Sequence, residues 1–266
     1  MRVAAICMQK NESSLIETWV LHHANLFGAE NVFVLDNQSD DLETCRVLKW
    51  AESCGVNVLY DFENFEFKGR EVRSLINKHR AEYDWFVPLD ADEFLGVFRN
   101  GSFAMRRSVV LSEFEMMRRD KIIRMSKYVW CIPRSPLGYF TEARKVIIPQ
   151  PVDVPLDIGF HLYSWDEGST GNTVADDLFQ QSHLAYAHFH NKPYHKVIAS
   201  AKLKLAARVP SFSAEDLNKY TGAGRHLIQY FNKTEDEYNK SFPSGTVNLT
   251  KAFFEAGLVA PFSTDN

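Results

Sequence analysis

Short apolar runs alternate with amphipathic segments over roughly the first ninety residues of the chain. Four runs have the length and composition of buried strands, and they lie at residues 3–8, 32–35, 56–60 and 85–89. Between them, apolar residues recur every three or four positions, which predicts helices over residues 14–27, 42–53 and 72–83. Strands separated by amphipathic helices predict a parallel sheet covered on both faces, with ligands at the carboxyl ends of its strands.

Residues at both ends of the first amphipathic segment predict where its helix begins and ends. Ser14 and Glu17 have the spacing of a capping box, in which each side chain accepts a hydrogen bond from a backbone amide of the first turn. Gly28 follows the last apolar position and is predicted to end the helix in the left-handed conformation. The second helix is predicted to stop at Gly55.

The pattern changes beyond residue 100. Strand-like runs follow one another with few helices between them, at residues 122–130, 144–148, 158–163 and 183–189. From Pro193 the chain becomes helical again, with helices predicted over residues 195–208, 223–238 and 249–256. The predicted fold class is therefore α/β: one domain with an N-terminal parallel βαβ half, a mixed sheet in its second half and a helical C-terminal tail.

Composition and charge narrow the class of protein. The 266 residues are 45% apolar and 24% charged, which is typical of a folded soluble protein, and the net charge of −4 gives no bulk attraction to nucleic acid. The four cysteines lack the spacing of a zinc knuckle or a disulfide framework. No apolar run is long enough for a signal peptide or a transmembrane segment, so we expect a cytoplasmic protein, with peripheral contact at the inner face of the membrane left open.

Carboxylates follow the fourth predicted strand directly. Asp90, Asp92 and Glu93 come after the apolar run 85–89, which delivers them to the ligand-bearing edge of the sheet. Side chains two residues apart can share one hard cation, and Mg²⁺ or Mn²⁺ bound in this way completes its shell with water and phosphate oxygens. The alternative is an acidic turn or a helix cap, and the position after a buried strand favours the metal.

Four histidines gather late in the chain, at residues 183, 188, 190 and 195. His188 and His190 lie on one face of a predicted strand, and imidazole is a common ligand of manganese and zinc. The alternatives are an ordinary core or surface role, or a zinc hydrolase built with the acidic pair. The sequence contains no HExxH motif, which weakens the hydrolase interpretation.

A basic run follows the histidines and has two interpretations. A solvated helix face is favoured, and a surface that meets an anionic ligand or a membrane is the alternative. The run consists of Lys192, His195, Lys196, Lys202, Lys204 and Arg208.

Several short motifs, in this order and spacing, resemble the family 2-type glycosyltransferases of GT-A fold, within the bacterial branch related to DUF23 or family 92 enzymes. The motifs are Lys10-Asn11-Glu12, Trp19 with His22-His23, Asp36-Asn37 with Ser39 and Asp41, Trp85 through Asp90-x-Asp92-Glu93-Phe94, Lys145 to Pro149, and His188 to Pro193. In the last motif, Phe189 and Pro193 replace the tyrosine and serine of the family. The resemblance covers about residues 3–200 and implies a transferase domain over residues 1–200, with a donor half at 1–95 and an acceptor half at 96–200, followed by a helical extension at 201–266.

The resemblance also implies roles at the acidic pair. Asp92 is expected to bind Mn²⁺ or Mg²⁺ directly, and Asp90 to contact the donor's ribose or sugar, or the metal through water. His188 matches a late histidine that joins the metal in many such enzymes.

Further residues are expected to contact the donor. Asp36 matches the acidic residue that meets the uracil or the ribose, and Asn11 and Glu12 are expected to line the same pocket. Such enzymes often place donor-binding side chains just before the acidic strand, at positions matched by Arg70, Arg73 and Asn77, and arginine suits diphosphate oxygens.

An inverting transfer, as the family resemblance implies, needs a carboxylate that takes the proton of the acceptor hydroxyl. Candidates after the acidic strand are Asp153, Asp157, Asp166, Glu167, Asp176 and Asp177. We select Asp157 because it lies between Pro155 and Gly159, just ahead of a predicted strand.

The sequence thus predicts a metal-dependent glycosyltransferase that moves a sugar from a nucleotide-sugar, with a UDP-sugar as the first choice, to a glycan or lipid-linked glycan in surface polysaccharide or lipopolysaccharide synthesis. One alternative is a nucleotide-sugar pyrophosphorylase or hydrolase. It would need a glycine-rich basic phosphate loop, which Lys10-Asn11-Glu12-Ser13 is not. The other is a non-enzymatic nucleotide- or glycan-binding module, which would not require the metal.

Overall fold

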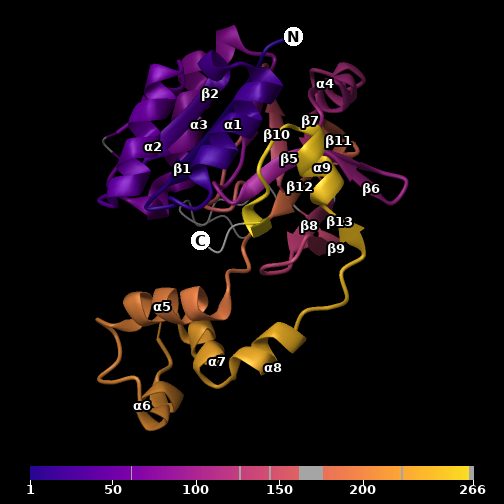
Figure 1. Cartoon of the computed structure of the whole chain (residues 1–266). Coiled ribbons are helices and arrows are strands. Elements are labelled where there is room, and N and C mark those ends of the chain that lie inside the picture. The colour runs from indigo at the N-terminus through magenta and orange to yellow at the C-terminus, as the bar shows by residue number, and fades with distance from the viewer. Residues whose placement is uncertain (61, 126, 144, 162–175, 223, 264–266) are drawn as a thin grey trace.

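The computed structural model describes the chain apart from residues 61, 126, 144, 162–175, 223 and 264–266. Its N-terminal part is a parallel sheet with helices on both faces (Figure 1). The strands are β1 (Val3–Gln9), β2 (Val32–Asp36), β3 (Asn57–Leu59) and β4 (Trp85–Pro88), paired in the order β3-β2-β1-β4. The helices are α1 (Ile16–Phe27), α2 (Leu42–Ser53) and α3 (Lys68–His79). The predicted parallel half of the α/β fold is confirmed.

Side-chain alternation along β1 explains why both faces of this sheet are covered. Ala5 and Cys7 belong to the large core that also contains apolar residues of α1 and α2. Ala4 and Ile6 point the other way and belong to a second core with apolar residues of α3. Because β1 is buried on both faces, it reads as a continuous apolar run.

The ends of the N-terminal helices differ in part from the prediction. The Ser14–Glu17 capping box is wrong: α1 begins at Ile16, and the amides of Leu15 and Ile16 donate to the carbonyl oxygen of Glu12 at 3.0 and 2.9 Å instead. Gly28 does end α1 with a positive φ of 96°, but its ψ of 142° is not that of the left-handed helical region. Helix α2 occupies the predicted range.

Helix α3 begins at Lys68, four residues before the predicted start, and tertiary contacts explain why. Gly69 packs so closely on the loop before residue 158 that an added Cβ would lie 2.0 Å from the carbonyl oxygen of Leu156. Only glycine fits this approach, and it places Lys68 in the interior.

The second half contains a mixed sheet, as predicted. Its elements are β5 (Glu93–Arg99), β6 (Ser102–Ala104), α4 (Arg107–Glu115), β7 (Ile122–Arg124), β8 (Lys127–Cys131), β9 (Leu137–Glu142), β10 (Val146–Pro149), β11 (Phe179–Gln181) and β12 (Leu184–His188). Strand β10 pairs antiparallel with β4 and extends the first sheet through β7 and β11, while β9, β8, β12, β5 and β6 form a second sheet. The strand predicted over 122–130 is therefore two strands in different sheets.

Residues 158–161 form a turn, which corrects the strand predicted there. The amide of Phe160 donates to the carbonyl oxygen of Asp157 at 3.0 Å, and the carboxylate of Asp157 accepts from the amides of Gly159 and His161 at 2.9 and 2.7 Å. Residues 162 and 163 of that predicted strand lie outside the described residues.

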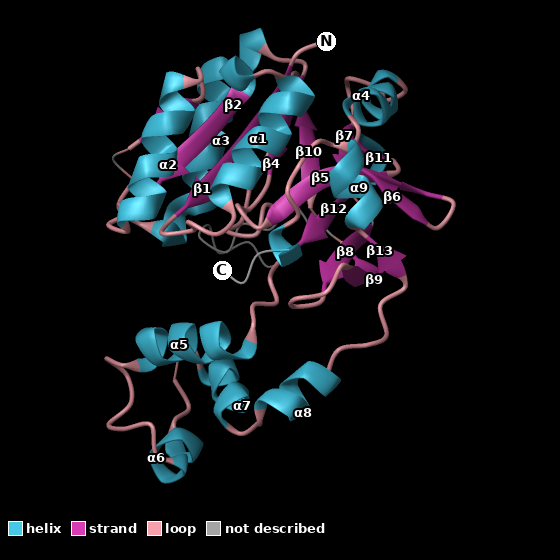
Figure 2. Cartoon of the chain, in the orientation of Figure 1, coloured by secondary structure: helices cyan, strands magenta, loops and turns pink. Residues whose placement is uncertain are grey.

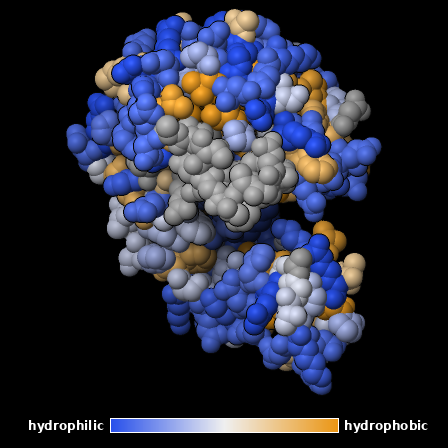
Figure 3. Space-filling view, turned by 180° about the vertical axis from the view of Figure 1, so that it is seen from behind, coloured by the Kyte–Doolittle hydropathy of each residue, from blue (hydrophilic) through white to orange (hydrophobic). Residues whose placement is uncertain are grey.

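The C-terminal helices form a small cluster apart from the body, joined to it by extended chain (Figure 2). They are α5 (Tyr194–Leu205), α6 (Ala214–Lys219), α7 (Ile228–Phe231) and α8 (Glu235–Lys240), so the single helix predicted over 223–238 is broken. Leu205, Val209, Leu217 and Ile228 make a separate core. Figure 3 shows this cluster as a lobe with a mainly hydrophilic surface.

The chain then returns to the body. Strand β13 (Val247–Asn248) pairs antiparallel with β9, and α9 (Thr250–Glu255) places Phe253 5.7 Å from the rings of Phe94 and Phe189. The domain boundaries predicted from the sequence stay a prediction, and the structure adds that part of 201–266 packs into the large core.

Single-turn 3-10 helices complete the described elements, at Ala29–Asn31, Phe65–Phe67, Arg80–Glu82, Asp176–Leu178, Arg225–Leu227 and Pro261–Ser263. Among the described residues, no helix combines the length and the apolar character needed to cross a membrane.

Candidate metal and nucleotide site

A tight turn between β4 and β5 presents the acidic residues at the carboxyl edge of the parallel strands. The amide of Glu93 donates to the carbonyl oxygen of Asp90 at 3.0 Å, and the Glu93 carboxylate accepts from the amide of Asp90 at 2.8 Å. The end of β12 lies beside this turn, because His188 is the register partner of Glu93 and the amide of Phe189 donates to the carbonyl oxygen of Asp92 at 2.8 Å. Two segments almost a hundred residues apart therefore meet at this edge.

Asp92, His188 and His190 form a cluster that could hold a metal ion, and we call it the metal cluster. One ligand atom from each residue lies within 4.8 Å of the others, and Nε2 of His188 is 3.4 Å from Oδ2 of Asp92. One carboxylate and two imidazoles suit Mn²⁺ and related divalent ions. Asp92 and His188 were predicted as ligands from the sequence, and His190 was weighed there but not selected.

The charges inside the metal cluster support one another. Burial raises the pKa of Asp92, but the hydrogen bond with His188 and the charges of His188 and His190 together lower it more, so the net direction of the pKa is downward. Burial lowers the pKa of His188, and the Asp92 carboxylate more than offsets this, so that pKa is raised. Asp92 and His188 therefore stabilise each other's charged forms.

Asp90 lies in a different environment, the lysine cluster, which consists of Asp90, Glu93, Lys68 and Lys145. One oxygen of Asp90 accepts from the ammonium of Lys68, and the other accepts from Nζ of Lys145 at 2.7 Å. Lys145 also lies 2.5 Å from Oε2 of Glu93. The lysine side chains are only 3% and 4% exposed, and the ring of Phe160 lies over both ammonium groups at 4.5 and 4.9 Å.

This balance of charge keeps Asp90 ionised. Burial raises the pKa of its carboxyl, but the ammonium groups of Lys145 and Lys68 lower it more, to well below its usual range. Burial lowers the pKa of Lys145, and Asp90 with Glu93 more than offsets this, so that pKa is raised. Asp90, Asp92 and Glu93 also lie close enough together to hold a cation, so the metal role predicted for Asp90 stays a prediction.

Sequence reasoning assigned no role to Lys68, Lys145 or Glu93. A weak signal exists for Lys145, since it directly precedes an apolar strand and belongs to one of the family motifs. Lys68 lies next to Gly69, but nothing local indicates that both residues are buried. Their partners are 22 and 55 residues away in the sequence, so only the folded chain reveals the network.

The ends of β1 and β2 are tied together beside the acidic turn. The Asp36 carboxylate is almost fully buried and accepts from Nε2 of Gln9 and from the hydroxyl of Ser39, both at 2.6 Å. Asn11, at a φ of 54°, donates its amide to Ser39 at 3.0 Å and its side chain to Asp40 at 2.7 Å. Asn11 and Asp36 are thus brought to one edge, as their predicted donor-binding roles require, and those roles stay predictions.

Glu12 joins this edge to the start of the C-terminal helices. Its carboxylate lies 3.3 Å from Nζ of Lys192. Burial raises the pKa of Glu12, Lys192 opposes this, and the nearby Asp92 carboxylate adds to it, with a net upward direction. Glu12 therefore lies within electrostatic reach of the metal cluster.

The predicted donor-binding residues of α3 have partners of their own. Arg70 stacks on the ring of Phe67 at 4.0 Å and pairs with Glu71 at 3.4 Å. Arg73 donates twice to Asp153, at 2.9 and 3.1 Å, and the side-chain oxygen of Asn77 accepts from Arg80. Their contact with a donor stays a prediction.

The predicted base, Asp157, is 6% exposed and holds the turn at 158–161. Besides the two backbone amides, it contacts Nδ1 of His161 at 3.0 Å. Burial raises the pKa of Asp157, and the His161 hydrogen bonds lower it more, so the net direction is downward. Of the other candidates, Asp153 binds Arg73, Asp176 lies 3.8 Å from Arg124, and Asp166 and Glu167 lie outside the described residues.

Comparison with known proteins gives no family model and no curated protein that matches the chain. Among solved structures, S. aureus TarS matches at a TM-score of 0.46 and 12% identity, over 86% of this chain and 42% of that one. M. tuberculosis glucosyl-3-phosphoglycerate synthase, in complex with Mn²⁺, UDP and glucosyl-3-phosphoglycerate, matches at 0.40 and 14%, over 77% and 79%. A cytidylyltransferase from Leptospira borgpetersenii matches at 0.33 and 11%, over 57% and 61%.

The chain thus spans 42% of the length of TarS and 61% of that of the cytidylyltransferase. At these identities and TM-scores the matches are likenesses of chain path alone, and function has to be inferred from the side chains at the strand ends.

Proposed function

We propose that the protein is a metal-dependent glycosyltransferase that moves a sugar from a nucleotide-sugar to an acceptor. One observation carries the proposal: the carboxylate of Asp92 and the imidazoles of His188 and His190 converge within 4.8 Å at the carboxyl edge of a parallel sheet. Ligands of open α/β sheets bind at this edge, and mixed oxygen and nitrogen donors suit Mn²⁺.

The residues of the metal cluster would hold Mn²⁺ or Mg²⁺, and the bound ion would supply charge stabilisation for the departing nucleotide diphosphate. Asp90 is kept ionised and oriented by Lys68 and Lys145, so its remaining lone pairs are available to hydroxyl groups of the donor's ribose or sugar. The work of the lysine cluster is to fix that carboxylate before the donor arrives, which lowers the cost of ordering it on binding.

The finer features belong to the same proposal and rest on the sequence motifs. The donor is a UDP-sugar, the transfer inverts the anomeric centre, and the acceptor is a glycan or lipid-linked glycan of a surface polysaccharide or lipopolysaccharide, handled in the cytoplasm at the inner face of the membrane. Asp157 would act as the base. Contacts to the donor would come from Asn11, Glu12, Asp36, Arg70, Arg73 and Asn77.

A thermal-shift panel tests the proposal. Nucleotide diphosphates and nucleotide-sugars are added with and without Mn²⁺ to the wild type, to Asp92→Asn and to the control Asp120→Asn. The control removes an exposed carboxylate that pairs with Arg118 and belongs to neither cluster. A ligand at about 100 times its Kd stabilises the folded state by about 2.7 kcal/mol. We expect UDP to raise the melting temperature only with Mn²⁺, in the wild type and the control but not in Asp92→Asn. If no nucleotide shifts the wild type with any metal, the proposal is wrong.

A further inference from the structure

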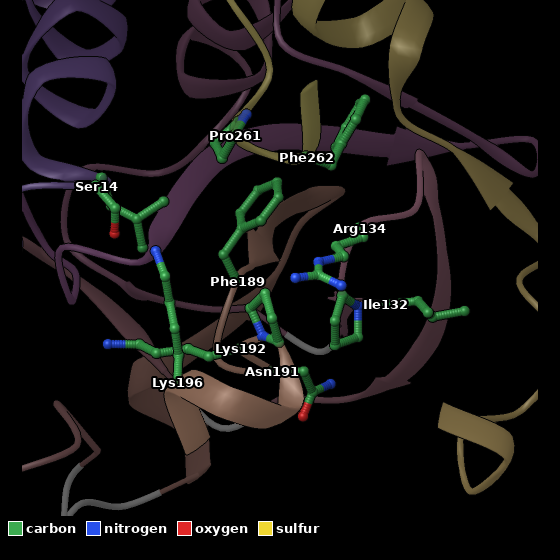
Figure 4. Close-up of a pocket in the computed structure, with 12 residues that line it drawn as sticks. Ser14, Ile132, Arg134, Phe189, Asn191, Lys192, Lys196, Pro261 and Phe262 are labelled. Carbon is green, nitrogen blue, oxygen red and sulfur yellow. The ribbon is translucent and has the colours of Figure 1, made fainter. Parts of the chain in front are cut away.

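A pocket lies where the chain leaves the body for α5. Its wall comes from four separate segments, including Ser14 before α1, Arg134 after β8 and Phe262 near the C-terminus (Figure 4). Phe189 and Lys192 line it from the segment that follows β12. The volume is about 70 Å³, several times the roughly 10–15 Å³ that one water molecule needs, so a group larger than water can enter.

Cations surround this pocket. Arg134, Lys192 and Lys196 all line it, and Figure 4 shows the two lysines on the Ser14 side of Phe189 and Arg134 on the other. Within the described part of the chain, Arg134 has one acidic partner, Glu235 at 3.8 Å, and Lys192 has one, Glu12 at 3.3 Å.

Lys196 differs from both, because its ammonium makes no ion pair or hydrogen bond with the described residues. Lys196 also lines a second, wider pocket, together with Glu17 and Glu43. These carboxylates disfavour an anion in the second pocket, so an anion would bind in the first, among the three cations.

The pocket is connected to the metal cluster. Phe189 lies between the two histidines of that cluster and donates its amide to the carbonyl oxygen of Asp92 at 2.8 Å. Lys192 contacts Glu12, whose carboxylate is within electrostatic reach of Asp92. The Phe189 backbone and the Lys192–Glu12 pair thus join the wall of the pocket to the site proposed for the donor.

The remaining wall suits an organic molecule that carries the anion. Phe189, Phe262 and Pro261 present apolar surface, while Ser14 and Asn191 add a hydroxyl and an amide. Ammonium and guanidinium groups recognise phosphate oxygens through charge-assisted hydrogen bonds. The three cations, the polar side chains and the apolar wall offer more contacts than a single carboxylate group would use.

We propose that this pocket binds a phosphate group of the acceptor, so that the enzyme glycosylates a phosphate-bearing molecule. The inference rests on the proposed function for its reaction and on Arg134, Lys192 and Lys196 for its site. The inference assigns different roles to residues of the basic run: Lys192 and Lys196 bind the anion, whereas Lys202 on α5 is part of the solvated helix face.

Calorimetric titration of the full chain with glycerol phosphate, without nucleotide or metal, tests the site directly. Lys196→Gln and Arg134→Gln each remove one cation and keep a side chain able to form hydrogen bonds, and Lys202→Gln is the matched control on the same helix. We expect binding by the wild type and by the control, about ten-fold weaker binding by each pocket variant, and none for uncharged glycerol. Absence of binding by the wild type, or equal binding by all variants, would overturn the inference.

Vesicles distinguish a lipid-borne phosphate from a soluble one. If the wild type binds phosphatidylglycerol vesicles but not phosphatidylcholine vesicles, and the Lys196→Gln variant does not bind phosphatidylglycerol vesicles, the phosphate is lipid-borne. If only glycerol phosphate binds in a pocket-dependent way, the acceptor is soluble. Vesicle binding that survives Lys196→Gln and is lost in Lys202→Gln would overturn the inference in favour of membrane contact through the outer helix face.

The UDP and Mn²⁺ measurement separates this inference from the proposed function. If the wild type binds glycerol phosphate through Lys196 but shows no nucleotide shift, the transferase proposal fails and the phosphate site stands. If the nucleotide shift is present and glycerol phosphate does not bind, only the acceptor inference fails.

Discussion

Asp90 and Asp92 are two residues apart on one turn, yet they belong to clusters of opposite character. The lysine cluster is buried and balanced, with two ammonium groups facing the carboxylates of Asp90 and Glu93. The metal cluster combines Asp92 with two imidazoles and contains no lysine or arginine among its members. The difference teaches that an acidic motif alone does not define a metal site: what surrounds each carboxylate decides whether it is already neutralised.

The largest effect is expected from breaking the lysine cluster at Lys145. Lys145→Met leaves the buried Glu93 carboxylate and the partly buried Asp90 carboxylate without their shared cation, and removing one partner of a buried ion pair such as Lys145–Glu93 costs about 3–5 kcal/mol. Unfolding in urea should show this loss of stability. The control Lys127→Met removes an exposed lysine and should change stability by less than about 0.5 kcal/mol. Equal stability of the two variants would mean that the lysine cluster is not a structural unit.

As the pH falls, protonation linked to the buried histidines should destabilise the protein before Asp90 of the lysine cluster is protonated. Burial lowers the pKa of His22 from 6.5 to about 4, so the unfolded chain binds more protons than the folded one between these values. The stabilising contribution of neutral His22 is therefore fully present above about pH 6.5. As the pH drops toward 4, the free energy of unfolding falls by about 3 kcal/mol because of this residue. His23 shifts in the same direction, whereas the lowered pKa of Asp90 delays its protonation to stronger acid.

Urea unfolding at a series of pH values measures this slope, and His22→Gln should flatten it. A slope that is the same in the variant would assign the acid sensitivity to other groups.

A moderate effect is expected at Gly69, which lets α3 carry Lys68 to Asp90. In Gly69→Ala the new Cβ would lie 2.0 Å from the Leu156 carbonyl oxygen, so helix or loop must move. Such overpacking costs about 1–3 kcal/mol. Thermal unfolding compares this variant with Ser74→Ala, which changes an exposed position of the same helix. If both variants melt like the wild type, the close approach is not a constraint.

The smallest effect on stability is expected at the metal cluster. Asp92→Asn keeps the shape of the side chain, and its partner His188 can give up its proton when the carboxylate is lost, so the metal-free protein should stay within about 0.5–1 kcal/mol of the wild type. Its affinity for Mn²⁺, measured by titration, should fall at least about ten-fold because a carboxylate ligand is lost. A large loss of stability with unchanged Mn²⁺ binding would reverse the roles of the two clusters.

Local periodicity predicted what local interactions determine. The strand and helix order of the first ninety residues and the bounds of α2 follow from spacing, because a helix face or a buried strand must match its own repeat. The convergence of Asp92 with His188 was anticipated only through motif resemblance, since their positions are related by the pairing of β12 with β5. Their metal-binding role awaits the Mn²⁺ measurements.

Other features depended on partners distant in the sequence. The Ser14 capping box is a local exception, since the carbonyl oxygen of the nearby Glu12 accepts from the amides of Leu15 and Ile16 instead. The single strand predicted over 122–130 divided because β7 pairs with β10 and β8 with β12. Strand β13 and helix α9 returned to the body because β9 supplies an edge and Phe94 an apolar contact.

The sequence by itself determined the α/β class, the parallel N-terminal half and the delivery of two carboxylates to the end of a buried strand, since each follows from hydrophobic periodicity along a short segment. Only the tertiary structure decided that Asp90 is neutralised by Lys68 and Lys145 while Asp92 faces two histidines. The physical reason is that burying charge is tolerable only when compensating groups arrive from elsewhere in the chain, and their arrival is a property of the fold.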